Sequence, residues 1–246
     1  MQRTTISKAK LKELAAYKQA KHCDEDNLFV VEGEKMAAEA LHSKVSILAI
    51  CATSEWLDAN TQLPHCNVFE VDKPQLERLS LMRTPNKVWM LIDRNLPPFH
   101  STSTLSLALD HIQDPGNMGT LLRTADWFGV RQVVCSADTV SVFNPKVVQA
   151  SMGAIFRTKV EYTDLPQWLD SCGKDIYGAV LNGQTECRCS TRPSVLVIGN
   201  ESRGISAEVL AKITHRITIP NIGGTAESLN AAVAAGILMH HLTSKL

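Results

Sequence analysis

The sequence predicts an α/β protein of two domains, of which the second has a mostly parallel sheet. Short apolar runs of β type alternate with segments of helical periodicity along almost the whole chain. The alternation is most regular in the second half, and strands separated by helices pair in parallel with both faces of their sheet covered. A length of 246 residues allows two hydrophobic cores of ordinary size.

The first domain, a small α/β unit, is expected over residues 1–98. Its first helix should cover residues 8–21, where Leu11 and Leu14 mark an apolar face at helical spacing. The polar segment 22–27 should be a loop. Runs of β-type residues predict strands over 28–31, 45–52, 68–71 and 87–93.

Three further helices complete the first domain. Two are short and lie around residues 36–41 and 54–59. The third begins with Pro74 in its first turn, where the N–H that proline lacks would have no partner in any case. The buried side of this helix should consist of Leu76, Leu79 and Leu81.

The second domain is expected over residues 104–246, after a linker at 94–104 with two prolines and several hydroxyl side chains. Its predicted strands cover residues 105–110, 132–135, 156–160, 175–181, 194–199 and 217–219. Its predicted helices cover residues 118–128, 145–152, 165–172 and 207–213, with a last one from about 228 to 242. Gly129 should end the first of these helices, and Ser206 should cap the fourth.

The composition is that of an ordinary globular protein, with 44% hydrophobic and 20% charged residues. The first residues lack the apolar core of a signal peptide. The longest apolar run, residues 231–239, is too short to span a bilayer. We therefore expect a cytoplasmic protein without a membrane segment.

Neither the cysteines nor the histidines show the spacing of a metal site. Seven cysteines are scattered without a C-x-x-C pair, and only one residue separates Cys187 from Cys189. Eight histidines show no HExxH pattern. The thiols are therefore expected to be reduced and mostly buried, and no metal is expected.

The net charge is zero, which by itself argues against a nucleic-acid partner. The first 22 residues are nonetheless basic, with Glu13 as their one acidic residue. Their cations are Arg3, Lys8, Lys10, Lys12, Lys18 and Lys21. Two interpretations stay open, a basic face that contacts nucleic acid and a solvated helix surface.

Three loops stand out at the carboxyl ends of strands, where parallel α/β sheets bind their ligands. In the first, residues 114–119, Gly116 and Gly119 let a ligand approach the backbone. Asn117 can cap the following helix. Arg123 lies four residues after Gly119 and therefore on the same helical face. The alternatives are a ligand-binding loop and a capped helix with a solvated or paired arginine.

The second loop, residues 199–204, places Glu201 and Arg203 between two glycines after an apolar strand. It lacks the GKS or GKT ending of a phosphate-binding P-loop, and the GxGxxG pattern of nicotinamide enzymes is absent. An ordinary strand-to-helix turn is the alternative.

The third loop, residues 220–230, contains the pair Gly223 and Gly224. Ser228 and Asn230 follow at the start of an almost wholly apolar helix. These two polar residues either cap the helix or serve a ligand at its amino end.

Together the three loops resemble the motifs of the SPOUT class of RNA methyltransferases, specifically its SpoU/TrmH family of ribose 2′-O-methyltransferases. The motifs are DPGNMGTLLRTADWFG at 114–129, LVIGNESRGIS at 196–206 and ITIPNIGGTAESLNAAVAAGI at 217–237. Upstream, LFVVEGEKMAAEAL at 28–41 resembles the small substrate-binding domain of many members, which is similar in fold to RNA-binding ribosomal proteins. The resemblance covers essentially the whole chain.

The resemblance implies methylation of a ribose 2′-hydroxyl in structured ribosomal or transfer RNA, with S-adenosylmethionine as the methyl donor. The catalytic residues it implies are Asn117, Arg123, Glu201, Ser228 and Asn230. The cofactor, held largely by backbone groups, would bind at Gly199, Ile219, Pro220 and Leu229. A trefoil knot in the C-terminal domain, an exception to the rule that chains do not thread loops, and a homodimer through that domain are also implied.

The third motif departs from the usual family pattern. The segment 219–228 is one residue longer than the commonest spacing, with Gly223 and Gly224 where one glycine is typical. Ala231 and Ala232 replace a more frequent Val-Ser. A longer loop could shift the adenosine or methionine end of the cofactor.

A ribose 2′-hydroxyl is a poor nucleophile at neutral pH, so methyl transfer needs in-line positioning and help with the hydroxyl proton. We assign Arg123 to the phosphate and the 2′-oxygen of the reacting nucleotide. A guanidinium stays protonated in proteins, so stabilising a developing alkoxide suits it better than acting as a base. Orienting roles are expected for Asn117, Ser228 and Asn230. Glu201 is expected to fix the loops or the substrate.

Two other function classes are considered. A non-catalytic RNA-binding or ribosome-assembly protein could retain the fold, but all five polar family positions are present. A nucleotide-dependent α/β enzyme of another kind is disfavoured because the phosphate-binding patterns are absent. Methylation of a base is a variant of the main hypothesis, and the sequence Ser228-Leu229-Asn230 favours the ribose.

Overall fold

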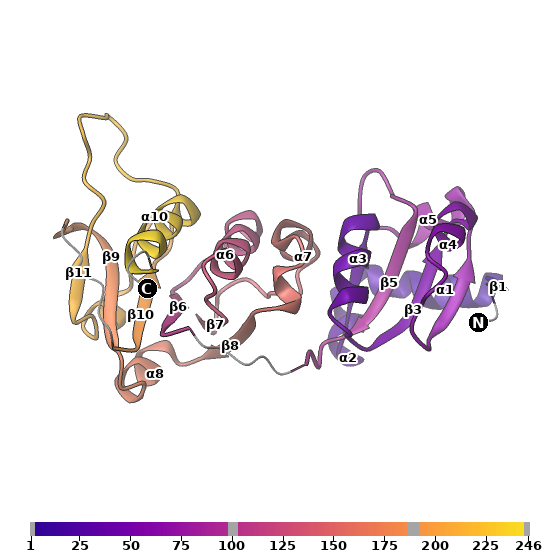
Figure 1. Cartoon of the computed structure of the whole chain (residues 1–246), viewed down its shortest axis with the longest axis horizontal. Helices are drawn as coiled ribbons and strands as arrows, with labels where there is room; N and C mark the ends of the chain where they lie inside the picture. The colour runs from indigo at the N-terminus through magenta and orange to yellow at the C-terminus, as the bar shows by residue number, and fades with distance from the viewer. Residues whose placement is uncertain (1–2, 98–102, 186–191, 244–246) are drawn as a thin grey trace. The chain divides into compact units, whose positions relative to one another are not determined.

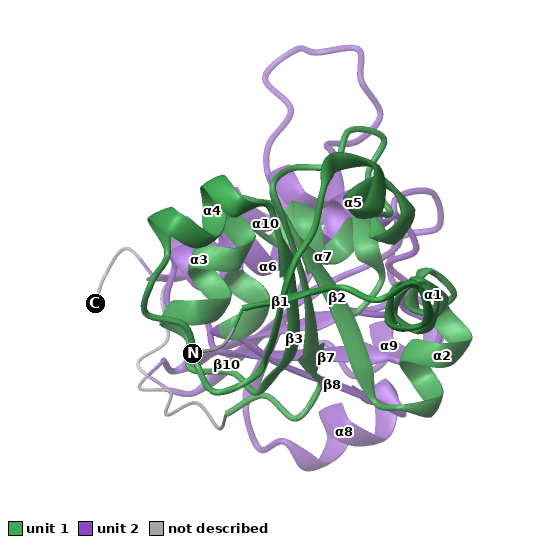
Figure 2. Ribbon diagram, turned by 90° about the vertical axis from the view of Figure 1, so that its right-hand side faces the viewer, with its two compact units in different colours: residues 1–98, 143–156 green, residues 99–142, 157–246 purple. Residues whose placement is uncertain are grey.

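The protein is described by a computed structural model that divides into two compact α/β units (Figure 2). The described residues are 3–97, 103–185 and 192–243. Unit 1 comprises residues 1–98 and 143–156, and unit 2 comprises residues 99–142 and 157–246. Cys187, Cys189 and part of the expected linker lie outside the described residues.

Unit 1 contains a mixed five-stranded sheet. Its strands are β1 (Thr4–Thr5), β2 (Leu28–Glu32), β3 (Ile47–Ala52), β4 (Asn67–Glu70) and β5 (Val88–Asp93). Its helices are α1 (Lys8–Ala15), η1 (Ala16–Lys18), α2 (Ala20–Glu25), α3 (Glu34–His42), α4 (Ser54–Ala59), α5 (Lys73–Leu79), α7 (Pro145–Ser151) and η2 (Ala154–Phe156). The strand order is β1-β4-β3-β5-β2, and β5 runs antiparallel to both of its neighbours.

The helix expected over residues 8–21 is wrong in its extent. It breaks at Gln19, whose backbone is extended (φ −93°, ψ 125°), and α2 follows where a loop was expected. The buried Cys23 accounts for this second helix, because its side chain joins Leu11 and Leu14 in the core of unit 1. A polar segment with one buried side chain therefore folds as a helix against that core.

Glu32, at the end of β2, is a buried carboxyl, 4% exposed. It accepts hydrogen bonds from the Ser80 hydroxyl and from the Leu81 N–H, the latter at 2.8 Å. Burial raises the pKa of this carboxyl above its ordinary value, and the two hydrogen bonds oppose that rise. Leu81 is exposed and not buried as expected, because α5 ends at Leu79 and the chain turns towards Glu32.

A segment from the second half of the sequence packs in unit 1. Residues 143–156, which contain α7 and η2, belong to this unit by their contacts. The Phe29 ring of β2 lies 5.0 Å from the Phe143 ring and 6.3 Å from the Phe156 ring, centroid to centroid. Aromatic packing on β2 thus groups α7 with a strand that precedes it by more than a hundred residues.

Unit 2 contains a six-stranded sheet with the strand order β11-β9-β10-β6-β7-β8, in which all neighbours are parallel. Its strands are β6 (Leu105–Leu109), β7 (Gln132–Ser136), β8 (Lys159–Thr163), β9 (Asp175–Gln184), β10 (Ser194–Ile198) and β11 (His215–Ile217). Its helices are α6 (Pro115–Trp127), α8 (Leu165–Ser171), α9 (Ala207–Leu210) and α10 (Ala231–Thr243). The prediction of a mostly parallel sheet is confirmed.

Helices cover both faces of this sheet. On one face α8 and α9 pack against apolar strand residues such as Val134 and Val197. On the other, α6 and α10 pack against each other (Figure 1). Gly236 of α10 faces Thr124 of α6, and a side-chain carbon at this position would make an ordinary van der Waals contact with it at 3.5 Å. Within the described ranges, no helix is both long enough and apolar enough to cross a bilayer.

Some boundaries in unit 2 differ from the prediction. β8 begins at Lys159 and not at residue 156, because residues 154–156 form the η2 turn. β11 ends at Ile217, two residues earlier than expected, and α10 begins only at Ala231. Ser206 stands at the N-cap position of α9 but its side chain forms no capping hydrogen bond. The segment between β11 and α10 is therefore longer than the sequence indicated.

Candidate active site

The three loops singled out in the sequence follow β6, β10 and β11. β6 and β10 are neighbours in the sheet, whereas β9 lies between β10 and β11. Because all of these strands are parallel, the three loops leave the sheet at the same edge. The topology therefore allows side chains from distant parts of the chain to meet there.

The sequence suggested that Asn117 caps α6, but Asn117 lies in the first turn of that helix and is not its cap. Asp114 has that role: its side chain accepts a hydrogen bond from the Asn117 N–H at 2.8 Å, and Pro115 follows in the first helical position. The Asp-Pro pair was the sequence signal for this cap. The side chain of Asn117 is left free for other contacts.

A chain of side-chain hydrogen bonds joins the three loops. The Asn117 Nδ2 donates to Glu201 Oε1 at 2.6 Å, and the Asn230 Nδ2 donates to Asn117 Oδ1 at 2.8 Å. A carboxylate can only accept, so Glu201 fixes which end of the Asn117 amide faces it and which end faces Asn230. Three of the five polar residues expected in the site are thus in direct contact.

Asn230 also caps α10. Its side-chain oxygen accepts from the N–H groups of Ala232 (3.0 Å) and Val233 (3.3 Å), and its Nδ2 is the donor to Asn117. The sequence left open whether Asn230 caps the helix or serves a ligand. Capping uses only the oxygen of its amide. The nitrogen links α10 to α6.

Arg123 and Ser228 are not brought into this chain. Six residues of helix turn through about 600°, so the Arg123 side chain leaves α6 roughly 120° away from that of Asn117. Arg123 is exposed and forms no hydrogen bond or ion pair with the residues that the structure describes. Ser228 lies in the exposed segment 220–230, which extends away from the sheet between β11 and α10 (Figure 1).

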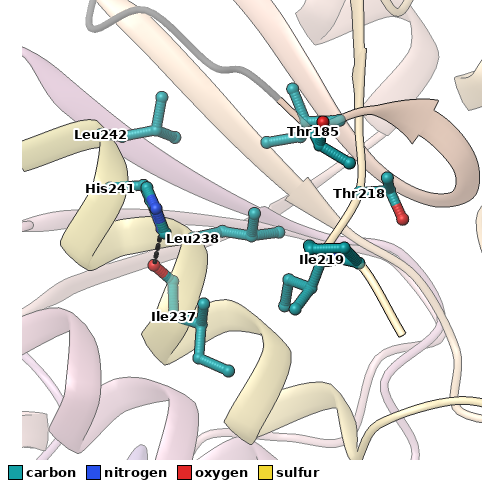
Figure 3. Close-up of a pocket in the computed structure, with 9 residues that line it drawn as sticks. Thr185, Thr218, Ile219, Ile237, Leu238, His241 and Leu242 are labelled. Atoms are coloured by element: carbon teal, nitrogen blue, oxygen red, sulfur yellow. Dashed lines mark hydrogen bonds between the residues drawn. The ribbon is translucent and has the colours of Figure 1, made fainter. Parts of the chain in front are cut away.

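Two of the four positions expected to hold the cofactor line a cavity of about 160 Å³ (Figure 3). Ile219 and Pro220 form one wall, and α10 supplies Ile237, Leu238 and His241. The His241 Nδ1 hydrogen bonds to the Ile237 carbonyl at 3.2 Å. Gly199 and Leu229 do not line this cavity. Its walls are mainly apolar, and its volume is below the ~300 Å³ at which pockets for whole small molecules begin.

The cavity and its surroundings fit part of a nucleoside cofactor. The apolar walls suit the face of a ring such as adenine. The backbone groups of Ile219 and Leu229 form no hydrogen bond within the described ranges and are free to bind the edge of a base or a sugar. Position 199 requires glycine for a structural reason, because a side-chain carbon there would lie 2.3 Å from the Gly204 backbone.

Two cysteine thiols of the chain are buried and unreactive. Cys51 and Cys135 are buried free thiols, and burial raises the pKa of each to about 12, so both stay protonated and unreactive. Among the residues that the structure describes, no three His, Cys, Asp or Glu side chains converge as metal ligands would.

Asn200 was not singled out in the sequence, although it shapes the second loop. Its side-chain oxygen accepts from the N–H groups of Ser202 (2.9 Å) and Arg203 (3.1 Å), an Asx turn of the kind that an Asn between loop residues favours. Its backbone pairs with Gly204 in both directions at 2.9 Å. The turn presents Glu201 towards α6.

Comparison with known proteins gives a consistent result. Residues 104–240 match the SpoU rRNA Methylase family, and residues 8–89 match the MRM3-like substrate binding domain. The chain is 32% identical over 222 residues, 88% of each chain, to the 23S rRNA (guanosine(2553)-2′-O)-methyltransferase RlmP of Bacillus subtilis.

Two solved structures resemble this one over nearly their full lengths. A TrmH-family protein from Porphyromonas gingivalis has a TM-score of 0.87 and 36% identity, covering 99% of this chain and all of that one. An AdoMet-bound rRNA methyltransferase from Sinorhizobium meliloti has a TM-score of 0.85 and 28% identity, covering 100% and 98%. Both the fold and the sequence thus relate this chain to one group of proteins.

The two roles of Asn230 can be separated by substitution. Asn230→Ala removes the cap of α10 and should lower the free energy of unfolding by about 1 kcal/mol. Asn230→Ser keeps a capping oxygen and should stay within a few tenths of a kcal/mol of the wild type, although it lacks the donor to Asn117. Urea denaturation of the three proteins measures this difference. Equal loss of stability in both variants would show that the bond to Asn117, and not the cap, is what stabilises α10.

Proposed function

The chain belongs to the SpoU rRNA methylase family, and on this premise we propose that it transfers a methyl group from S-adenosylmethionine to a ribose 2′-hydroxyl of structured RNA, ribosomal or transfer RNA. The observation that carries the proposal is the hydrogen-bond chain from Glu201 through Asn117 to Asn230. It joins one polar residue from each family motif at one edge of the sheet. Glu201 and Asn230 are exposed and Asn117 is half-buried, so this chain adds little to the hydrophobic core and a fold kept only for stability would have little need of it.

S-adenosylmethionine supplies an electrophilic methyl group on a sulfonium, so the protein has to place the 2′-oxygen in line and manage its proton. Arg123, exposed and without a partner in the described ranges, is available for the phosphate and the 2′-oxygen of the nucleotide. As a permanent cation it would stabilise negative charge that develops on that oxygen. Asn117 and Asn230 would orient the ribose, with Ser228 brought in from the exposed loop.

The cofactor would be held at Ile219, Pro220, Leu229 and Gly199. Support comes from the apolar cavity beside Ile219 and Pro220 and from the free backbone groups of Ile219 and Leu229. Ordering of the exposed segment 220–230 over the bound nucleoside would bring Leu229 to it. Gly199 would contribute through its backbone, since the Gly204 backbone occupies the space that a side chain at position 199 would need.

We further propose that residues 1–98 form the RNA-binding domain and residues 104–246 the catalytic domain, with the knot that the family resemblance implies, in a cytoplasmic protein. The family matches over 8–89 and 104–240 support this division. A crystal structure with S-adenosylhomocysteine would test the knot and the cofactor positions together. An unthreaded chain in that complex would contradict the proposal.

Calorimetric titration with S-adenosylmethionine and S-adenosylhomocysteine, followed by transfer of a labelled methyl group to unmodified ribosomal and transfer RNA, tests the function. We expect at least one of the two compounds to bind. We also expect the label to appear in alkali-resistant dinucleotides, because 2′-O-methylation protects the adjoining phosphodiester from alkali. The second candidate is a non-catalytic RNA-binding protein, which the small cavity favours, as does Ser228, exposed and without a hydrogen bond to the described residues. RNA binding without binding of either compound would select it.

Replacement of the arginine tests its role in methyl transfer. Arg123→Ala should lower turnover by roughly 10² to 10³-fold, because the charge that stabilises the developing alkoxide is lost. The affinity for S-adenosylmethionine should stay as in the wild type. Arg192→Ala is the control, since Arg192 precedes β10 at the other edge of the sheet and faces Asp175 at 3.8 Å. Unchanged turnover in Arg123→Ala would overturn the assignment.

The lysines of α1 differ in how free they are to bind RNA. Lys8 and Lys12 are exposed and form no ion pair within the described ranges, whereas Lys10 is paired with Glu13 at 2.6 Å. The double variant Lys8→Gln/Lys12→Gln should therefore reduce the slope of log K against log salt for RNA binding by about 1 to 2. Lys10→Gln is the matched control and should change it less. An equal slope in all three proteins would make α1 a solvated surface.

Association of two copies through unit 2 is also proposed. It is supported by Trp127 of α6, 85% exposed, and Val233 of α10, 51% exposed, on two helices that pack together. Apolar side chains of this size at the surface favour burial in an interface. Trp127→Glu should convert a dimer to a monomer in sedimentation velocity at micromolar concentration. A monomeric wild-type protein under those conditions would refute the proposal.

A further inference from the structure

A second polar cluster lies directly behind the active-site loops, and the proposed function does not use it. Asp110 follows β6 and continues its pairing with β10, since its N–H donates to the Ile198 carbonyl at 2.9 Å. Its carboxyl is 1% exposed. One oxygen meets the His111 Nδ1 at 2.7 Å, and the other accepts from the Ser206 N–H at 2.6 Å. Asp110 thus contacts the residues on either side of the second loop, Ile198 before it and Ser206 after it.

The imidazole of His111 lies between two carboxylates. Its Nδ1 faces Asp110, and its Nε2 lies 2.9 Å from Asp138, which follows β7. Each ring nitrogen thus faces one carboxylate oxygen, and the imidazole bridges the ends of β6 and β7. Ser136 completes the cluster. Its hydroxyl donates to Asp138 at 2.8 Å and accepts from the backbone N–H of His111 at 2.9 Å.

The backbone of His111 has φ +59°, in the left-handed region that residues with a side chain adopt uncommonly. The contacts of the ring with Asp110 and Asp138 hold the residue in this conformation. As a result the His111 carbonyl points to the second loop, where it accepts from the Asn200 Nδ2 at 2.8 Å. The ring and the carbonyl of one residue therefore connect two carboxylates to Asn200.

Asn200 passes this restraint on to Glu201. Its side chain, tied to His111 by the nitrogen, uses the oxygen to hold the N–H groups of Ser202 and Arg203. Glu201 lies inside this turn and reaches Asn117 at 2.6 Å. A shift of Asn200 would therefore move the acceptor that orients the Asn117 amide.

We propose that His111 is a positioning residue for the active site, whose imidazole, held between Asp110 and Asp138, fixes the 200–204 turn so that Glu201 orients Asn117. The catalytic part of this inference rests on the proposed methyl transfer. The structural part, that the ring fixes the turn, stands independently of it. His111 acts only through Asn200 and Glu201 and touches no substrate.

The structural part is tested by hydrogen–deuterium exchange. His111→Asn keeps a residue type that accepts positive φ but has no ring to reach Asp138. Amides in the peptide covering residues 199–206 should exchange at least about tenfold faster, because Ser202, Arg203 and Ser206 lose well-placed acceptors. The control is His215→Asn, which removes an imidazole that stacks on Tyr177 at 4.7 Å in the same unit. Exchange in residues 199–206 that matches the control would overturn the proposal.

The catalytic part is tested by steady-state methylation kinetics on the RNA that the wild type labels. His111→Asn should lower kcat by about ten- to a hundredfold while KM for S-adenosylmethionine stays within twofold, because misplacement of a positioned group affects the reacting geometry. A rise in KM alone, or faster exchange with unchanged kcat, would reduce His111 to a residue of local stability and refute its positioning role.

Asp138→Asn provides a second variant that should fold even if His111→Asn does not, since Asp138 is 48% exposed. It should shift exchange and kcat in the same direction as His111→Asn. The double variant should be no worse than His111→Asn alone, because both changes break the same restraint. Additive losses would contradict the proposal. A wild type that binds no S-adenosylmethionine would sink the proposed function, and the exchange data would still decide whether His111 fixes the turn.

Discussion

The carboxylate of Glu201 is the constraint on which the hydrogen-bond chain between the three loops depends. It can only accept hydrogen bonds, so the amide of Asn117 must present its nitrogen to Glu201 and its oxygen to Asn230. One charged group thereby sets the direction of a chain that spans three loops. An isolated amide between two amides would have no such fixed direction.

The parallel sheet of unit 2 makes this chain possible. β6 and β10 are neighbours, so the loops that carry Asn117 and Glu201 leave the sheet side by side. Asn230 directly precedes α10, which packs on α6. The cluster of Asp110 and His111 lies at the same edge and connects β6 to the turn after β10. The packing of α10 on α6 and the geometry of the loops after β6 and β10 thus both determine the positions of Asn117, Glu201 and Asn230.

Unit 1 uses a buried polar group in a comparable way. Glu32 lies in the core at the end of β2 and accepts from Ser80 and Leu81, which fixes where the chain leaves α5. The cost of burying the carboxyl shows in its raised pKa. In both units an acidic side chain behind a loop determines the course of that loop. The polar groups of a loop need such partners when the surrounding residues are apolar.

The sequence by itself determined the α/β class, the parallel sheet of unit 2 and the three motifs, because periodicity and glycine placement are local properties of the chain. Local signals also misled where a distant partner decided the structure: α2 forms because Cys23 joins the core, and Leu81 is exposed because Ser80 turns to Glu32. Residues 143–156 pack on Phe29, which no pattern along the chain could show. Only the tertiary structure joined Glu201, Asn117 and Asn230 and placed His111 behind them, since contacts across 84 and 113 residues depend on strand order.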